Sequence, residues 1–434
     1  MYRIPLRPAC HSGTIQNMHA SARLSVIRRP ELVAAAGDWP GLRSAVQAGA
    51  DAVYFGCTDL NMRYEAANFD LLEIKKAVAF LHQHDKKAYL TVNTIVYDRE
   101  ALKLKRLLRQ ARASGVDAVI AWDIAVIEAA RALGIPVHLS TQASVANASA
   151  VIFFAGLGVR RVVLARECSL TDIAGIIRQL KRRRVHCEVE TFIHGAMCMS
   201  ISGRCFLSHA LSGRSANRGR CLHPCRRRYL IKDTEEGKEM ILGRDYILSA
   251  QDLCAVDFLD RLIVAGIDAF KIEGRMRSPD YIATVTAVYR CAIDAFFAGT
   301  LSAELKAALK ARLGEVFNRG FSSGFYFGPP RAGGSPGGGA AAEKVFLGEV
   351  VNFYDRIQVA EILVRNQRVK KNDTILFYGK TTPASWAQAQ ELQIDHRPVR
   401  AAGKGSSVGI KIPFLVRPRD KVFLWKKKRS ADTR

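Results

Sequence analysis

The sequence predicts an α/β fold in which a TIM-type (β/α)8 barrel is followed by a small all-β domain. From residue 31 onward, short apolar and β-branched runs alternate with amphipathic stretches, and eight such runs occur before residue 274. Near-continuous apolar runs are typical of parallel strands that are buried on both faces. Eight strand–helix units are the number that closes a barrel. An open, doubly wound sheet is the alternative.

The expected strands follow one another at regular intervals along the first 273 residues. They are 31–37, 50–56, 87–93, 118–123, 136–142, 160–166, 186–193 and 268–273. Stretches such as LLEIKKAVAFLHQH and REALKLKRLLRQARAS lie between them and have the apolar stripe of a covering helix. We therefore assign residues 29–328 to the barrel domain, with further helices over 281–316.

The remaining segments have distinct compositions. Residues 329–344 are rich in Gly, Pro and Ala and are interpreted as a linker. Residues 345–427 contain the runs FLGEVVNF, RIQVAEI, DTILFYG, SSVGIKI and KVFLW, which predict a small β-barrel domain, and 428–434 form a basic tail. Residues 1–28 contain no acidic residue and are interpreted as a disordered tail or an early start codon, since Met18 could begin the protein; a transit peptide is the alternative.

Four cysteines lie in an insertion, residues 194–245, that follows the seventh strand. They are spaced as Cys198-x6-Cys205-x15-Cys221-x3-Cys225. Zinc sites usually pair their cysteines in two short knuckles, and only the last pair here is that close. The wider spacing suits an iron–sulfur cluster, with zinc or inert buried thiols as alternatives. Loops after barrel strands lie at the active-site rim, so we expect this centre over the barrel mouth.

The charge pattern indicates a polyanionic partner. The net charge is +25, and residues 178–228 hold twelve Lys and Arg against two acids. Nucleic acid is the favoured partner; a solvated face, an acidic small substrate or a membrane surface are the alternatives. No apolar run approaches the roughly 18 residues of a membrane span. The absence of a signal-like apolar segment favours a cytoplasmic protein with free thiols.

Several segments resemble the collagenase-like (U32) peptidase family, in the family's order and over about residues 29–427. They are GADAVYFG, LSTQASVAN, VVLARECSL, ETFIHGAMCMSISGRCFLS, SANRGRCLHPCRRRY and KIEGRMRSPDYI. The resemblance implies an iron–sulfur protein that hydroxylates without molecular oxygen. The family's branches act on the wobble uridine of transfer RNA with prephenate as the hydroxyl source, on a cytidine of ribosomal RNA, or on quinone precursors. The layout is most similar to the transfer RNA branch, and peptidase activity is the alternative that the family name implies.

The resemblance also implies roles for particular residues. Cys198, Cys205, Cys221 and Cys225 would hold a cluster, expected to be 4Fe-4S, with Cys254 as a reserve ligand should Cys225 prove structural. An unidentified electron donor would be a further partner. Prephenate is a dicarboxylate, so its site needs arginine or lysine. Strand ends and loops at the rim supply the candidates. Those expected to be catalytic are Arg166, Glu167, His194, Lys271, Glu273 and Arg275, and those expected to bind substrate are Gln142, Asn147, Arg204, Arg214, Arg218 and Arg226. An ordinary rim salt bridge or structural hydrogen bond is the alternative for each.

Other motifs are interpreted more simply. The G-x-S-x-G string at 320–324 lies beyond the barrel strands and is expected to be a turn and not a nucleophile elbow. His223 is expected to lie in a turn before Pro224 and not to be a ligand. The aromatic residues Tyr229, Phe321, Phe325 and Tyr326 are candidates for stacking on RNA bases, with core packing as the alternative.

Overall fold

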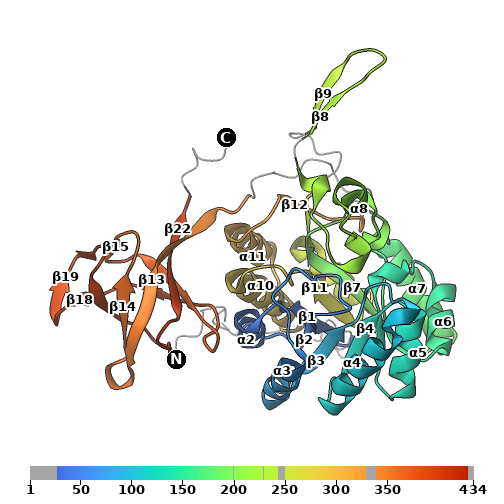
Figure 1. Cartoon of the computed structure of the whole chain (residues 1–434), viewed down its shortest axis with the longest axis horizontal. Coiled ribbons are helices and arrows are strands. Elements are labelled where there is room, and N and C mark those ends of the chain that lie inside the picture. The colour runs from blue at the N-terminus through green and yellow to red at the C-terminus, as the bar shows by residue number, and fades with distance from the viewer. Residues whose placement is uncertain (1–26, 199, 228, 243–249, 329–338, 429–434) are drawn as a thin grey trace, which may run out of the picture.

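The computed structural model describes residues 27–198, 200–227, 229–242, 250–328 and 339–428 (Figure 1). Eight parallel strands form a closed barrel, because each strand pairs with the next and the last pairs with both the first and the seventh. This confirms the predicted barrel. The strands are β1 (Glu31–Ala35), β2 (Ala52–Gly56), β3 (Lys87–Thr91), β4 (Ala118–Ala121), β5 (Val137–Leu139), β6 (Val159–Val163), β7 (Glu188–Gly195) and β11 (Ala269–Ile272).

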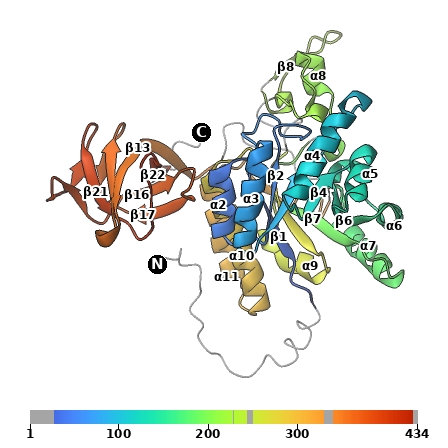
Figure 2. The same ribbon diagram turned by 60° about the horizontal axis from the view of Figure 1, so that its bottom comes forward.

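Helices cover the outside of this barrel (Figure 2). Most begin at an Asp, Asn or Ser whose side chain accepts a backbone N–H of the first turn, as at Asp70 and Ser169. No helix in the described ranges is long and apolar enough to cross a membrane. The helices are α2 (Trp39–Gln47), α3 (Leu71–Gln83), α4 (Ala101–Ala113), α5 (Ile124–Ala132), α6 (Ala148–Gly156), α7 (Leu170–Arg182), α9 (Leu259–Val264), α10 (Pro279–Phe297) and α11 (Ala303–Glu315).

Charged side chains are buried inside the barrel. Glu190 on β7 accepts hydrogen bonds from Lys271 Nζ at 2.7 Å and from Arg161 Nη1 at 3.1 Å. Arg161 also bonds Glu31 at 2.7 Å and Glu188 at 2.6 Å. Buried charges are tolerated only when each has partners. This network therefore links β1, β6, β7 and β11 below the mouth of the barrel.

The sequence predicted an insertion between β7 and β11 but not the elements that it contains. It contains α8 (Leu207–Ser212) and a hairpin of β8 (Tyr229–Lys232) and β9 (Glu239–Leu242) that projects from the barrel (Figure 1). The chain then returns as β10 (Asp252–Cys254), which pairs antiparallel with β7 and parallel with β12 (Phe321–Ser322). Neither the hairpin nor these two short strands was predicted. The strands β10 and β12 are two to three residues long and pair with segments that are distant in sequence, so no local pattern marks them.

The C-terminal domain is an antiparallel sheet with the order β17-β16-β22-β13-β14-β21-β18-β19. The five predicted runs correspond to β13 (Ala342–Tyr354), β14 (Val359–Val364), β16 (Thr374–Tyr378), β21 (Ser407–Lys411) and β22 (Lys421–Lys427). The strands that were not predicted are short: β15 (Val369–Lys370), β17 (Ser385–Gln388), β18 (Leu392–Ile394), β19 (Arg397–Val399) and β20 (Ala401–Ala402). Most of the predicted N-terminal tail, linker and basic tail lies outside the described residues.

The C-terminal domain lies beside α2 and α10 (Figure 2). Ala283 of α10 packs with Leu376 and Phe423 of the sheet. Ala384 donates its backbone N–H to Ser44 Oγ of α2 at 2.9 Å. The two domains therefore share a small apolar contact with polar links at its edge.

The buried network generates a stability prediction. Glu190→Gln leaves Lys271 without its carboxylate, and removing one partner of a buried ion pair costs about 3–5 kcal/mol. We expect a clear fall in the urea midpoint measured by circular dichroism. Glu239→Gln is the control, because Glu239 and Lys232 are both exposed and 3.6 Å apart, so its loss costs about 0–1 kcal/mol. Equal midpoints for the two variants would contradict this account.

Candidate functional site

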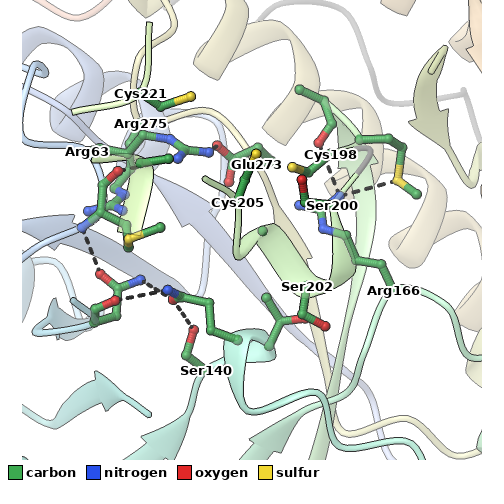
Figure 3. A pocket seen from close by; sticks show the side chains of 18 of the residues that line it. Arg63, Ser140, Arg166, Cys198, Ser200, Ser202, Cys205, Cys221, Glu273 and Arg275 are labelled. Carbon is green, nitrogen blue, oxygen red and sulfur yellow. Dashed lines mark hydrogen bonds and ion pairs between the residues drawn. The ribbon is translucent and has the colours of Figure 1, made fainter. Parts of the chain in front are cut away.

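A cavity of about 370 Å³ lies at the carboxyl ends of the barrel strands, beneath the insertion (Figure 3). Its walls come from the loops after β2, β3, β5, β6, β7 and β11 and from the insertion itself. Ten of the residues predicted for the site line it together. They are Gln142, Arg166, Cys198, Cys205, Cys221, Cys225, Arg226, Lys271, Glu273 and Arg275.

The four cysteines reach this cavity from separate turns of the insertion. Tight turns bring them there: Gly219, with φ +83°, passes so close to the loop after β2 that a Cβ would lie 2.3 Å from a backbone oxygen. None of the four is in a disulfide; Cys198 is exposed and the others are half-buried. Backbone N–H groups lie 3.3 Å from Cys205 Sγ and 3.4 Å from Cys221 Sγ. Such donors stabilise thiolates.

The donor set fits an iron–sulfur cluster. Burial raises the pKa of the Cys225 thiol, Arg226 lowers it, and the neighbouring cysteines raise it again. Iron–sulfur clusters are held by cysteine thiolates, usually four.

The cavity carries excess positive charge. Of its described lining residues, five are cationic and one is a carboxylate, Glu273. Arg63 Nη2 donates to Glu273 Oε1 at 3.0 Å. Burial alone would raise the pKa of Glu273, but Arg63, Arg166 and Arg275 outweigh it and hold the pKa at about 2. Glu273 is therefore ionised and cannot donate a proton near neutral pH. The five cations are Arg63, Arg166, Arg226, Lys271 and Arg275.

Two of the arginines have only uncharged partners among the described residues. Arg275 Nη1 donates to Asn61 Oδ1 at 3.1 Å and to Thr91 Oγ1 at 2.7 Å. Arg166 donates to the Ala196 carbonyl at 3.2 Å, and its guanidinium lies 3.8 Å from the centre of a phenylalanine ring. Their charges remain available to an anion in the cavity.

Neutral polar groups complete the walls. Gln142 Oε1 accepts from Ser140 Oγ at 2.9 Å and from Asn93 Nδ2 at 3.0 Å, and Gln142 Nε2 donates to the Asn93 carbonyl at 3.0 Å. These bonds fix the amide. The Ser202 hydroxyl is buried without a hydrogen-bond partner among the described residues. A buried polar group of this kind is satisfied when a ligand or water binds.

The sequence profile of Peptidase family U32 matches residues 37–335. The chain belongs to this family. It is 40% identical over 403 residues to a protein of Methanocaldococcus jannaschii named as an uncharacterized protease, covering 91% of this chain and 98% of that protein. It is 35% identical over 407 residues to a collagenase of Porphyromonas gingivalis, covering 92% and 98%. It is 36% identical over 362 residues to tRNA hydroxylation protein P1 of Bacillus subtilis, covering 82% and 84%.

Two predicted site residues of this U32 protein lie behind the cavity wall. In β7 an extra residue forms a bulge, since Phe192 pairs with Lys271 but His194 pairs with Ile272. The bulge turns His194 toward α10, where its Nδ1 lies 3.2 Å from the Tyr289 hydroxyl. Burial and then the charge of Arg277 lower the pKa of His194 to about 3. His194 does not line the cavity, and its catalytic role remains a prediction.

The reserve ligand Cys254 lies with His194. It sits on β10, opposite His194 in the strand pairing, and its Sγ is 3.9 Å from the Tyr289 hydroxyl. Burial raises its pKa to about 11, and it does not line the cavity. Its position therefore separates it from the four cysteines, and Cys225 is the fourth thiol at the site.

Other predicted residues have structural partners at the rim. Asn147 caps α6 through a hydrogen bond from the Ala150 N–H at 2.9 Å. Glu167 is exposed and accepts the Ser202 N–H at 3.2 Å, and Arg204 donates to Ser144 Oγ at 3.0 Å. None of Asn147, Glu167 and Arg204 lines the cavity. Arg214 and Arg218 line a separate hollow described below.

Most of the expected stacking aromatics pack within the protein. Tyr326 is buried and donates to the Phe192 carbonyl at 2.7 Å, and Phe321 lies against the His194 ring. Tyr229 donates to the Pro224 carbonyl at 2.8 Å. In the G-x-S-x-G string, the Ser322 hydroxyl accepts the N–H of Gly324 at 3.3 Å, which is the bond of a turn.

Sequence reasoning missed Arg63, which forms the direct ion pair of the cavity. It follows β2 in a loop of mixed composition. The only signal in the sequence is its position after the carboxyl end of a barrel strand. Asn61 and Thr91, which hold Arg275, are neutral and carry no such signal.

The cysteine arrangement predicts how a cluster depends on each thiol. We expect Cys198→Ser, Cys205→Ser, Cys221→Ser and Cys225→Ser each to lose most of the iron and sulfide bound after anaerobic reconstitution, because a serine is a poor substitute for thiolate. Cys254→Ser should retain wild-type iron and sulfide. Colourless wild-type protein that binds only zinc, or equal loss in Cys254→Ser, would contradict the assignment.

Proposed function

We propose that this U32 protein is an iron–sulfur-dependent, oxygen-independent RNA hydroxylase that forms 5-hydroxyuridine at the wobble position of transfer RNA, with prephenate as the hydroxyl source. One observation carries the proposal: the four cysteines line the same cavity as five cationic side chains and a single carboxylate. The cavity therefore combines a redox-competent donor set with a site for a small polyanion.

The cation set suits a dicarboxylate. Carboxylates bind the planar fork of arginine through paired hydrogen bonds. Arg166 and Arg275 present guanidinium groups that no described carboxylate pairs directly. Glu273 stays ionised beside Arg63 and keeps that side chain fixed. The buried Ser202 hydroxyl and the fixed Gln142 amide would orient the hydroxyl and carbonyl groups of the ligand.

A cluster held by Cys198, Cys205, Cys221 and Cys225 would supply one-electron transfer at the edge of the cavity. The backbone N–H groups next to Cys205 and Cys221 would hold its thiolates in place. Replacing the C5–H bond of a uridine by C5–OH oxidises the base. Because the prephenate hydroxyl carries oxygen at the level of an alcohol, two electrons must leave the base. An electron acceptor outside this chain would take them, and the C5 proton would leave to solvent.

RNA is supported as the second substrate by charge and by relatives. The net charge of +25 favours a polyanion. Relatives in Bacillus subtilis and Helicobacter pylori are named as tRNA hydroxylation proteins. A relative in Escherichia coli is named as a 23S rRNA 5-hydroxycytidine synthase, but this chain spans only 40% of its length.

Peptidase activity is the second candidate, because two relatives are named as a collagenase and a protease. Such an activity needs an activated nucleophile or a metal-bound water. In the described part of the chain, Ser322 lies in a turn and His194 is bonded to a tyrosine. The cavity therefore supports hydroxylation better than hydrolysis.

The anion site generates a kinetic prediction. Arg166→Gln removes a charged hydrogen-bond donor worth about 1.5–3 kcal/mol, so the KM for prephenate should rise about 10- to 100-fold. Arg160→Gln is the matched control, because Arg160 is exposed and does not line the cavity. An equal KM for Arg166→Gln and the control would exclude Arg166 from prephenate binding.

The proposed function is tested by nucleoside mass spectrometry of transfer RNA from a deletion strain. We expect 5-hydroxyuridine and its derivatives to disappear and to return with the wild-type gene but not with Cys198→Ser. An unchanged profile, in a strain without a redundant pathway, would refute the transfer RNA assignment. Loss of a ribosomal RNA or quinone hydroxyl in the same strain would redirect it to that substrate.

A further inference from the structure

A second hollow, of about 560 Å³, lies beside the cavity. Its walls come from the loop after β2, from residues 94–103 at the start of α4, and from residues 213–220 of the insertion. We propose that this hollow, the basic groove, binds the phosphate backbone of the RNA segment that flanks the target nucleotide. The inference rests on the proposed function and adds a site to it.

The groove and the cavity share a wall. Met62 and Arg63 line the cavity, whereas Tyr64 lines the groove. Cys221 lines the cavity, whereas Arg220 lines the groove. Likewise, Asn93 lines the cavity, whereas Thr94 lines the groove. A strand lying in the groove would therefore hold its neighbouring nucleotide at the cavity.

The charges of the groove are not balanced. Its two acidic side chains are each paired, Asp59 with Lys103 at 2.7 Å and Glu100 with Arg218 at 2.9 Å. Three arginines remain that have no carboxylate partner among the described residues. They are Arg99, Arg214 and Arg220. All three are exposed and would meet phosphate groups without first breaking an ion pair.

Two of these three arginines lie over the rings of exposed tyrosines. The Arg220 guanidinium lies 4.8 Å from the Tyr64 ring centre, and Arg99 lies 4.4 Å from that of Tyr97. The two tyrosines are 40% and 42% exposed. Unstacked bases bind aromatic and guanidinium planes, and they do so with little sequence preference.

A buried hydroxyl also points to a ligand. Thr94 lines the groove with only 2% of its surface exposed, and its Oγ1 has no hydrogen-bond partner among the described residues. A phosphate or ribose oxygen would satisfy it. An acidic peptide could meet the arginines, but it would leave the exposed rings of Tyr64 and Tyr97 without a base to contact, so the groove favours RNA.

Binding of total transfer RNA to the full-length, iron-loaded protein tests the inference. The variant Arg99→Ala/Arg214→Ala/Arg220→Ala should bind at least tenfold more weakly in 0.1 M salt, and the slope of log Kd against log salt should fall by about 2–3, because each phosphate contact contributes about 0.7–0.9. The matched control is Arg109→Ala/Arg131→Ala/Arg160→Ala, which removes three exposed arginines that line neither the cavity nor the groove. The control should bind within threefold of wild type, and both variants should retain iron.

A single substitution tests the groove independently, in case the triple variant does not fold. Arg214 is exposed and has no hydrogen bond or ion pair within the described ranges. Arg214→Glu should therefore keep its iron and bind transfer RNA at least fivefold more weakly. Wild-type affinity in this variant would overturn the groove assignment.

The outcomes separate the inference from the proposed function. Wild-type protein that binds transfer RNA, together with a triple variant of unchanged affinity and salt slope, would overturn the groove and leave the function intact. Wild-type protein that does not bind transfer RNA would overturn both. Displacement of bound RNA by poly-glutamate more readily than by unlabelled transfer RNA, at equal charge concentration, would assign the groove to an acidic protein and overturn the inference.

Discussion

The charge balance around Glu273 is the constraint on which the rest of the site depends. Arg63, Arg166 and Arg275 all act on this carboxylate, but only Arg63 bonds it directly. Burying more cations than anions opposes folding. The protein tolerates the excess by placing Arg275 on neutral oxygens and Arg166 over an aromatic face. If the cavity binds the anion proposed above, its cations are already in place before binding, which is the arrangement that electrostatic catalysis requires.

Inside the barrel, below the cavity, the buried charges are balanced by ion pairs. Around Glu190, each buried cation has a carboxylate within hydrogen-bond distance. Lys271 belongs to both regions, since it lines the cavity but bonds Glu190. β11 thus carries one paired charge inside the barrel, and Glu273 and Arg275 follow its carboxyl end at the mouth. The paired charges link β1, β6, β7 and β11 beneath the cavity.

The insertion contributes to two surfaces at once. Its cysteines face the cavity, and its arginines at 214–220 face the basic groove. The close approach at Gly219 brings this segment against the loop after β2. Because cavity and groove share the same short segments, a polymer bound in the groove would be held in a fixed relation to the small molecule in the cavity. This is how one chain could bring two unlike substrates together.

The periodicity of the sequence was enough to predict the eight barrel strands, because each buried strand has its own local apolar run. The spacing of the four cysteines was also visible, since their chemistry is rare and concentrated. The C-terminal strands were predicted where their runs were long and missed where they were two to four residues. Arg63 could not be selected, because one arginine in a mixed loop resembles many others.

Which rim residues face the cavity was decided only by the tertiary structure. In a regular strand, His194 would face the same side of β7 as Glu190 and Phe192. The bulge between Phe192 and His194 turns the His194 side chain away from the cavity instead. Cys254 also lies away from the cavity, because it pairs with His194 where β10 runs along the end of β7. A bulge arises from the pairing of two strands that are distant in sequence, so no local sequence pattern predicts it. The sequence alone therefore determined the barrel and the thiols, whereas the packing of distant loops determined which cationic side chains line the cavity and the second hollow.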